Sequence, residues 1–319
     1  MKWLRWLFAV GNPVDSPALA AAIERAVEHV DPRLKQCPSY PGRFRKAVAH
    51  ALEYAHRLAA QVPGPVAVNR DTFVSDPLVH ALFASPDDIH AALCVSRAMH
   101  DYRQAHPDAG EVYALLCMRR GTKSTLGIEL EGEVLRRDVP QQAVYFSGHT
   151  LADVGHTEAE ARARIAEGFF ASLVGHVRQR IEARKQEKTV LETRRDELLA
   201  ALHSAPAERR RGLEAELQDL LKHLGSVTES LALRRYIEDF EAVLLAPERH
   251  VYLERTTLLL DSMGLLRTQD SEGHHKIEFC DLAGRDRRRW TVALMYCDRV
   301  HEEATLGDRL MVAQRWLGL

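Results

Sequence analysis

The sequence lacks a long apolar run and lacks any large excess of charge of one sign. Lys and Arg together number 43 and Asp and Glu number 45, which gives a formal net charge of −2. This balance gives no indication of a nucleic-acid or membrane partner. The 319 residues are 46% hydrophobic and 28% charged, which is typical of a globular protein with one large core or two smaller ones.

Cysteine is scarce, and its pattern indicates no disulfide framework. The cysteines are odd in number and no two of them form a CxxC pair. This usage is typical of a reducing compartment, where thiols serve as small core residues. We therefore expect a cytoplasmic protein. The five cysteines are Cys37, Cys94, Cys117, Cys280 and Cys297.

The apolar segment at the N-terminus is too short to span a membrane, and no signal-peptide cleavage site follows it closely. It carries Trp3 and Trp6 beside Lys2 and Arg5. Two interpretations remain. The segment docks on the core as a strand or short helix, which we favour, or it makes peripheral membrane contact through Trp3 and Trp6.

Motifs for catalysis and metal binding are also absent. The segment 121–125 lacks the glycine spacing of a P-loop, the segment 301–305 lacks the second histidine of a zincin, and no GxSxG elbow occurs. We therefore expect no catalytic residue, cofactor or metal site, although a site that forms only in space stays open. One group of residue types suited to zinc matches no ligand spacing: His149, Asp153, His156 and Glu158.

The strongest pattern in the sequence is a pair of helices between Thr157 and Leu245. Thr157 and Glu160 form a capping box, in which each side chain satisfies an amide at the start of a helix. Pro206 suits the first turn of a second helix, and Pro247 ends it. A short link between two long helices favours an antiparallel pair.

A seam of apolar residues repeats along the second helix in alternating steps of four and three, as in a coiled coil. On the first helix two long cations fall on the seam, where their stems can cover leucines. We expect an antiparallel coiled-coil hairpin that projects from a globular body, although both helices can instead pack along their whole length. The seam residues are Leu213, Leu217, Leu220, Leu224, Val227 and Leu231 on the second helix, and Ile181, Lys188, Leu191, Arg195, Leu198 and Leu202 on the first.

The remaining patterns predict an α+β fold in which this hairpin is inserted between the strands of an antiparallel sheet. The predicted meander has a turn at 119–123 and a break at Pro140, and a helix is expected over about 248–263. Four regions result: 1–109, an N-terminal helical region; 110–156, the β meander; 157–246, the hairpin; and 247–319, a helix, a β-hairpin and a C-terminal helix.

Two charged surfaces are candidate binding sites. One is an arginine-rich β-hairpin suited to phosphates, although the interleaved Asp281 and Asp286 are also typical of a solvated turn. The other is the tip of the helical hairpin, whose charges suit an electrostatically steered contact. The first comprises Arg285, Arg287, Arg288 and Arg289, and the second comprises Pro206, Glu208, Arg209, Arg210 and Arg211.

These observations favour a non-enzymatic structural or interaction protein that uses the helical hairpin for self-assembly or for binding a protein partner. One alternative is a nucleic-acid-associated protein that uses the arginine-rich β-hairpin. Another is an enzyme whose site the sequence does not reveal.

Overall fold

The computed structural model describes residues 17–107, 110–131, 134–284, 289–297 and 310. Apart from Leu310, the predicted C-terminal helix lies outside these residues, as do Trp3 and Trp6. The chain forms two compact units, Met1–Tyr54 with Phe170–His250 and Ala55–Phe169 with Val251–Leu319. The division falls within helices α3 (Arg45–Gln61) and α8 (Glu158–Ser204), so both units combine segments that are distant in sequence.

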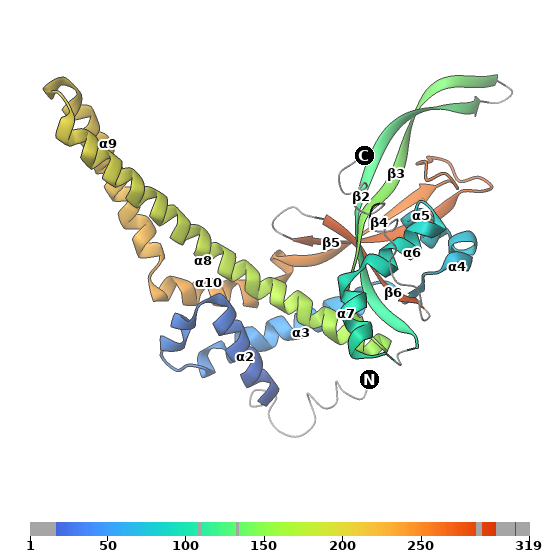
Figure 1. Cartoon of the computed structure of the whole chain (residues 1–319), viewed down its shortest axis with the longest axis horizontal. Helices are drawn as coiled ribbons and strands as arrows, with labels where there is room; N and C mark the ends of the chain where they lie inside the picture. The colour runs from blue at the N-terminus through green and yellow to red at the C-terminus, as the bar shows by residue number, and fades with distance from the viewer. Residues whose placement is uncertain (1–16, 108–109, 132–133, 285–288, 298–309, 311–319) are drawn as a thin grey trace. The chain divides into compact units, whose positions relative to one another are not determined.

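The second unit is built on a six-stranded sheet with the order β3-β2-β6-β5-β4, and the short β1 pairs parallel to β6. Its other pairings are antiparallel. The helical hairpin lies in the chain between β3 and β4, so the predicted α+β fold is confirmed (Figure 1). The strands are β1 (Val66–Ala67), β2 (Val112–Glu131), β3 (Val134–Gly155), β4 (Val251–Leu260), β5 (His275–Gly284) and β6 (Arg289–Cys297).

Four short helices pack against this sheet, each after a polar N-cap whose side chain accepts a hydrogen bond from the first turn. They form a core with the strands in which Leu82, Tyr102, Met118 and Phe279 are buried. The helices are α4 (Arg70–Ser75), α5 (Pro77–Leu82), α6 (Pro86–Val95) and α7 (Arg97–Ala105), with caps Asn69, Asp76, Ser85 and Ser96.

The first unit is helical. The apolar face of α2, with Leu19, Ile23 and Val27, is buried. The rings of Phe44 and Phe240 pack in a tilted arrangement with their centroids 4.7 Å apart. The elements of this unit besides α3 and α8 are α2 (Pro17–Val30), the 3-10 helices η2 (Pro32–Gln36), η3 (Gly42–Phe44) and η4 (Pro247–Arg249), and the helices α9 (Ala207–Ser230) and α10 (Leu233–Leu245).

The helix expected over about 248–263 is wrong, because Val251–Leu260 forms strand β4. This strand pairs with β5 along its whole length, from Val251 opposite Gly284 to Leu260 opposite His275. Its leucines have a spacing that a helix can also use. The long-range pairing therefore decides the structure, as is common for segments rich in β-branched and aromatic residues.

The turn expected at 119–123 and the break expected at Pro140 are also wrong, since β2 and β3 continue through both positions. Pro140 lies on β3, which is an edge strand, opposite Leu126 of β2. The missing N–H of a proline is tolerated on an edge strand. A Cβ on Gly121 would lie 2.5 Å from the ring of Tyr145, so this ring covers the glycine from the opposite strand. The result is a long ribbon instead of a meander.

The start of α8 is fixed to the end of α3 within the sheet unit. The guanidinium of Arg162 donates to the carbonyls of Ala59, Val62 and Gly64 over 2.8, 3.0 and 3.1 Å. Gly64 has φ +114°, and a Cβ there would lie 2.1 Å from the Leu294 carbonyl oxygen, so only glycine fits. The end of α3, the first part of α8 and strand β6 are thereby locked together.

A buried ion pair lies at the border of the sheet core. Arg120 Nη2 is 2.5 Å from Asp281 Oδ2, and the Thr291 hydroxyl donates to Asp281 Oδ1 over 2.7 Å. The side chains of Arg120 and Asp281 are only 18% and 4% exposed. The Arg120 guanidinium also lies over the ring of Phe279. Removing one partner would leave a buried charge without its counter-ion.

We therefore expect Arg120→Ala to lower the free energy of unfolding by about 3–5 kcal/mol, as is usual for breaking a buried pair. Urea unfolding followed by circular dichroism measures this change. Arg289→Ala is the matched control, since Arg289 pairs with Glu254 at 3.1 Å while 61% exposed, and its loss should cost at most about 1 kcal/mol. Equal costs in the two variants would contradict the importance of the buried pair.

Candidate interaction surface on the helical hairpin

Helix α8 begins as the sequence predicts. The Thr157 hydroxyl accepts a hydrogen bond from the amide of Glu160 over 3.2 Å. The Glu160 carboxylate accepts from the amide of His156 over 3.1 Å, one residue earlier than a capping box requires. Both side chains therefore satisfy amides at the helix start, where the backbone has no partner of its own.

The two helices of the hairpin are antiparallel. Arg194 pairs with Glu216 at 2.7 Å, and Glu187 lies 3.1 Å from the ring of His223. Partner numbers on α9 rise as those on α8 fall, which is the order of an antiparallel pair (Figure 1). The predicted direction of the hairpin is therefore confirmed.

The predicted seam is the less exposed side of both helices. Of its members, Ile181, Leu198 and Val227 are buried, and all the others are half-buried. Lys188 and Arg195 lie on the seam as expected, and their charged ends pair with acids of the same helix. Lysine and arginine cover apolar surface in this way, with the aliphatic stem against leucines and the charged end at the edge of the seam.

The expectation of one continuous second helix is wrong, because the chain breaks between α9 and α10. Ala232 is extended, with φ −64° and ψ 146°. The Ser230 hydroxyl donates to the carbonyl of Val227 over 2.7 Å, and the break releases the Ser230 carbonyl from helical bonding. Arg184 of α8 donates to that carbonyl over 3.2 Å, so a side chain of the other helix satisfies it.

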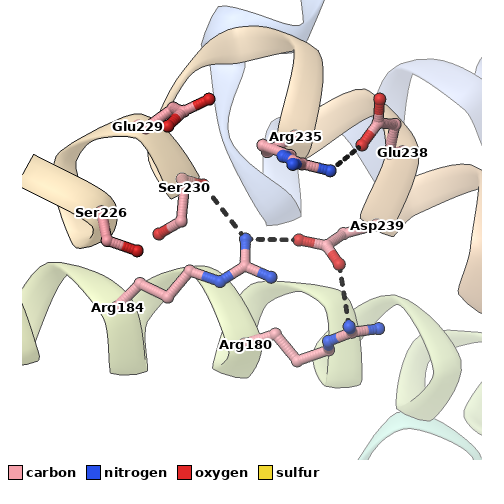
Figure 2. A pocket seen from close by; sticks show the side chains of 8 residues that line it. All are labelled: Arg180, Arg184, Ser226, Glu229, Ser230, Arg235, Glu238 and Asp239. Carbon is pink, nitrogen blue, oxygen red and sulfur yellow. Dashed lines mark hydrogen bonds and ion pairs between the residues drawn. The ribbon is translucent and has the colours of Figure 1, made fainter.

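A pocket of about 360 Å³ lies at this break (Figure 2). Asp239 on α10 receives Arg180 at 2.9 Å and Arg184 at 2.6 Å, both from α8. Arg235 pairs with Glu238 of its own helix at 2.8 Å. The lining contains three guanidiniums and three carboxylates, so its charges balance, and it is suited to bracing the break. The lining residues are Arg180, Arg184, Ser226, Glu229, Ser230, Arg235, Glu238 and Asp239.

A second brace lies close to the point where α8 leaves the other helices of its unit. Asp31, at the start of η2, accepts from the amide and guanidinium of Arg33 and from Lys185 at 3.1 Å. Burial alone would raise the pKa of the Asp31 carboxyl, but these hydrogen bonds outweigh it and lower the pKa to about 2. Its side chain is only 8% exposed.

Beyond Lys185 the polar contacts of the hairpin with described residues stay within the hairpin. Within the described part of the chain, every hydrogen bond and ion pair of residues 186–225 joins two residues of the hairpin. We call residues 186–225 the distal hairpin. Figure 1 shows this stretch extending beyond helices α2 and α10 of its own unit.

The tip of the distal hairpin, residues 206–211, is exposed at every position. Arg209, Arg210 and Arg211 form no ion pair with any residue that the structure describes. All five predicted tip residues are therefore accessible.

Of the predicted arginine patch, only Arg289 lies in the described residues, and it pairs with Glu254 at 3.1 Å. Arg285, Arg287 and Arg288 lie outside them. Near Arg289, the guanidinium of Arg119 lies 5.0 Å from the centre of the Trp290 ring. The structure therefore does not test whether the four arginines form one surface.

Three of the four residues with zinc-ligand chemistry have separate partners. His149 Nε2 is 2.8 Å from the carbonyl of Leu82, and Glu158 pairs with Arg162 at 2.7 Å. His156 lies 2.5 Å from Glu160. No three His, Cys, Asp or Glu side chains of the described residues gather closely enough to hold a metal ion.

Cys117 has a perturbed pKa, which bears on the enzyme alternative. Burial, together with the smaller effect of the nearby Asp153 carboxyl, raises the pKa of its thiol to about 12. Burial also raises the pKa of Asp153, which adopts a left-handed backbone with φ 54° at an irregularity of β3. A thiol with so high a pKa stays protonated at neutral pH and is a poor nucleophile.

Comparison with protein-family models, with curated proteins and with solved structures finds no match to this chain. Among the described helices, none has the length and apolar content needed to cross a bilayer.

Asp31 makes the stability of the helical unit depend on pH. Its folded-state pKa lies below its unfolded value, so the stabilisation is present above the unfolded pKa and is lost as pH falls from about 4 to about 2. Asp31→Asn should cost about 2 kcal/mol at neutral pH and nothing at the acid end. Urea unfolding across this range measures the difference. Glu182→Gln is the matched control, because Glu182 also pairs with Lys185 but is 44% exposed. Its loss should change stability little at any pH.

Proposed function

We propose that this chain is a cytoplasmic, non-enzymatic interaction protein whose distal hairpin binds a protein partner or a second copy. The observation that carries the proposal is that the polar contacts of residues 186–225 stay within the hairpin while most of its surface is exposed. Ordering a residue costs about 1–2 kcal/mol of conformational entropy. Burial of the seam residues offsets this cost. Because the seam occupies only one face of each helix, both flanks and the tip remain open to another molecule.

The two flanks of the distal hairpin differ in chemistry. Arg194 and Glu216, which pair across the helices, each precede a seam residue. Leu199 and Leu221 each follow one and are 40% and 47% exposed. On a helix, positions before and after the seam lie on opposite sides of it. One flank is therefore closed by charges, and the other, which also carries Glu192 and Glu214, exposes the two leucines to a partner.

A shortened chain tests the proposal. Deleting residues 189–202 together with 208–221 removes two heptads from each helix. The two deleted segments face each other across the hairpin, so the remaining seam residues stay in register. We expect the chain to stay folded and to lose the partner that the tagged full-length chain captures from nuclease-treated lysate. Mass spectrometry quantifies the partner, and light scattering measures self-assembly. A capture that vanishes with nuclease would favour nucleic-acid association through Arg289 and its neighbours instead.

The apolar flank permits a finer comparison. Leu199→Glu with Leu221→Glu should weaken the captured complex by about tenfold or more, which corresponds to about 1.4 kcal/mol of lost apolar contact. The matched control is Val74→Glu with Met263→Glu, because these side chains are 83% and 80% exposed but lie in the sheet unit. Titration of the purified partner measures both pairs. Equal weakening by the control would mean that the hairpin flank is not the contact.

A further inference from the structure

We propose that the tip, residues 206–211, binds an acidic segment of the partner protein. This inference rests on the proposed function and names the chemistry of the partner. The tip carries one carboxylate, Glu208, and three guanidiniums, which give it a net charge of +2. All of these side chains are exposed. Arginine forms planar, paired hydrogen bonds with carboxylates, so the surface suits a cluster of Asp and Glu.

The tip arginines differ in their pairing from the arginines in the part of α8 that runs from residue 180 to residue 204. From residue 180 to residue 204, each arginine of α8 is ion-paired: Arg180 and Arg184 with Asp239, Arg194 with Glu197 and Glu216, and Arg195 with Asp196. Arg209, Arg210 and Arg211 have no such pair among the described residues. Their charges are available to another molecule.

These arginines also oppose the polarity of their own helix. Helix α9 begins at Ala207, and its N-cap Pro206 makes no side-chain hydrogen bond. The amino end of a helix carries partial positive charge, so cations in the first turns destabilise it and acids stabilise it. The three arginines therefore contribute nothing favourable to the start of α9. A bound carboxylate would offset this local repulsion.

The size of the surface favours an acidic protein segment over a nucleic acid or a membrane. Three consecutive residues span only about 3–5 Å of helix axis. They can neutralise few phosphates, whereas stable binding to a duplex commonly uses about 6–10 phosphate contacts. A membrane-binding tip would also need large apolar side chains, and residues 205–207 are Ala, Pro and Ala. An acidic segment can instead combine the tip with contacts along the hairpin.

The test uses a fluorescently labelled poly-glutamate peptide and a short duplex DNA as probes, with anisotropy measured at low salt. The variant is Arg209→Glu with Arg210→Glu and Arg211→Glu in the full chain. Its matched control is Arg25→Glu with Lys46→Glu and Arg178→Glu, which makes the same charge change at exposed cations that have no ion pair among the described residues. We expect the tip variant to weaken peptide binding by about tenfold and the control by at most about twofold.

A second readout separates binding from folding. Because the variant places acids at the start of α9, its thermal midpoint should stay equal or rise by about 2 °C while binding is lost. Equal loss of peptide binding in both variants would overturn the inference, because net charge alone would explain it. Tighter, tip-dependent binding of the DNA would overturn it in favour of a nucleic acid.

The captured partner separates this inference from the proposed function. If the shortened hairpin loses the partner and the tip variant retains it, the hairpin is the binding element and the tip inference fails. If neither variant loses the partner, both fail.

Discussion

The carboxylate of Asp239 is the point on which the helical unit depends. Its side chain is 9% exposed, and a buried charge is costly unless counter-charges surround it. Arg180 and Arg184, one turn apart on α8, provide them, and Arg184 also satisfies the Ser230 carbonyl at the break. One cluster thus holds α10 against α8 and fixes where α9 departs.

Much of the hairpin could be predicted because its signals are local. The cap at Thr157, the seam and the antiparallel direction follow from spacings within one or two helical turns and from a short link. The break at Ala232 could not be predicted, since no proline or glycine marks it. It is stabilised by Arg184, some fifty residues earlier in the chain. The spacing of Arg180 and Arg184 on one face, with Asp239 on the returning helix, was the available signal.

The sheet shows the same distinction in reverse. Residues 251–260 have leucines at helical spacing, and only their partner β5 makes them a strand. Proline and glycine, which normally mark turns, are carried inside the long ribbon because Pro140 lies on an edge strand and Tyr145 covers Gly121. The charged tip, like these turns, was inferred from local residue composition alone. That the tip arginines lack ion pairs with the described residues, while the arginines of α8 between residues 180 and 204 have them, is visible only in three dimensions.

This difference in pairing gives the hairpin two kinds of charge with different effects. An exposed ion pair such as Arg194–Glu216, with both side chains 49% exposed, contributes at most about 1 kcal/mol. The ion pairs between α8 and α9 therefore act mainly on the register of the two helices, because a shifted register would bring like charges together. Unpaired charges at the tip have no partner in the hairpin to lose, so a carboxylate that approaches them breaks no existing bond. A contact placed there therefore replaces no ion pair of the hairpin and leaves the alignment of its two helices unchanged.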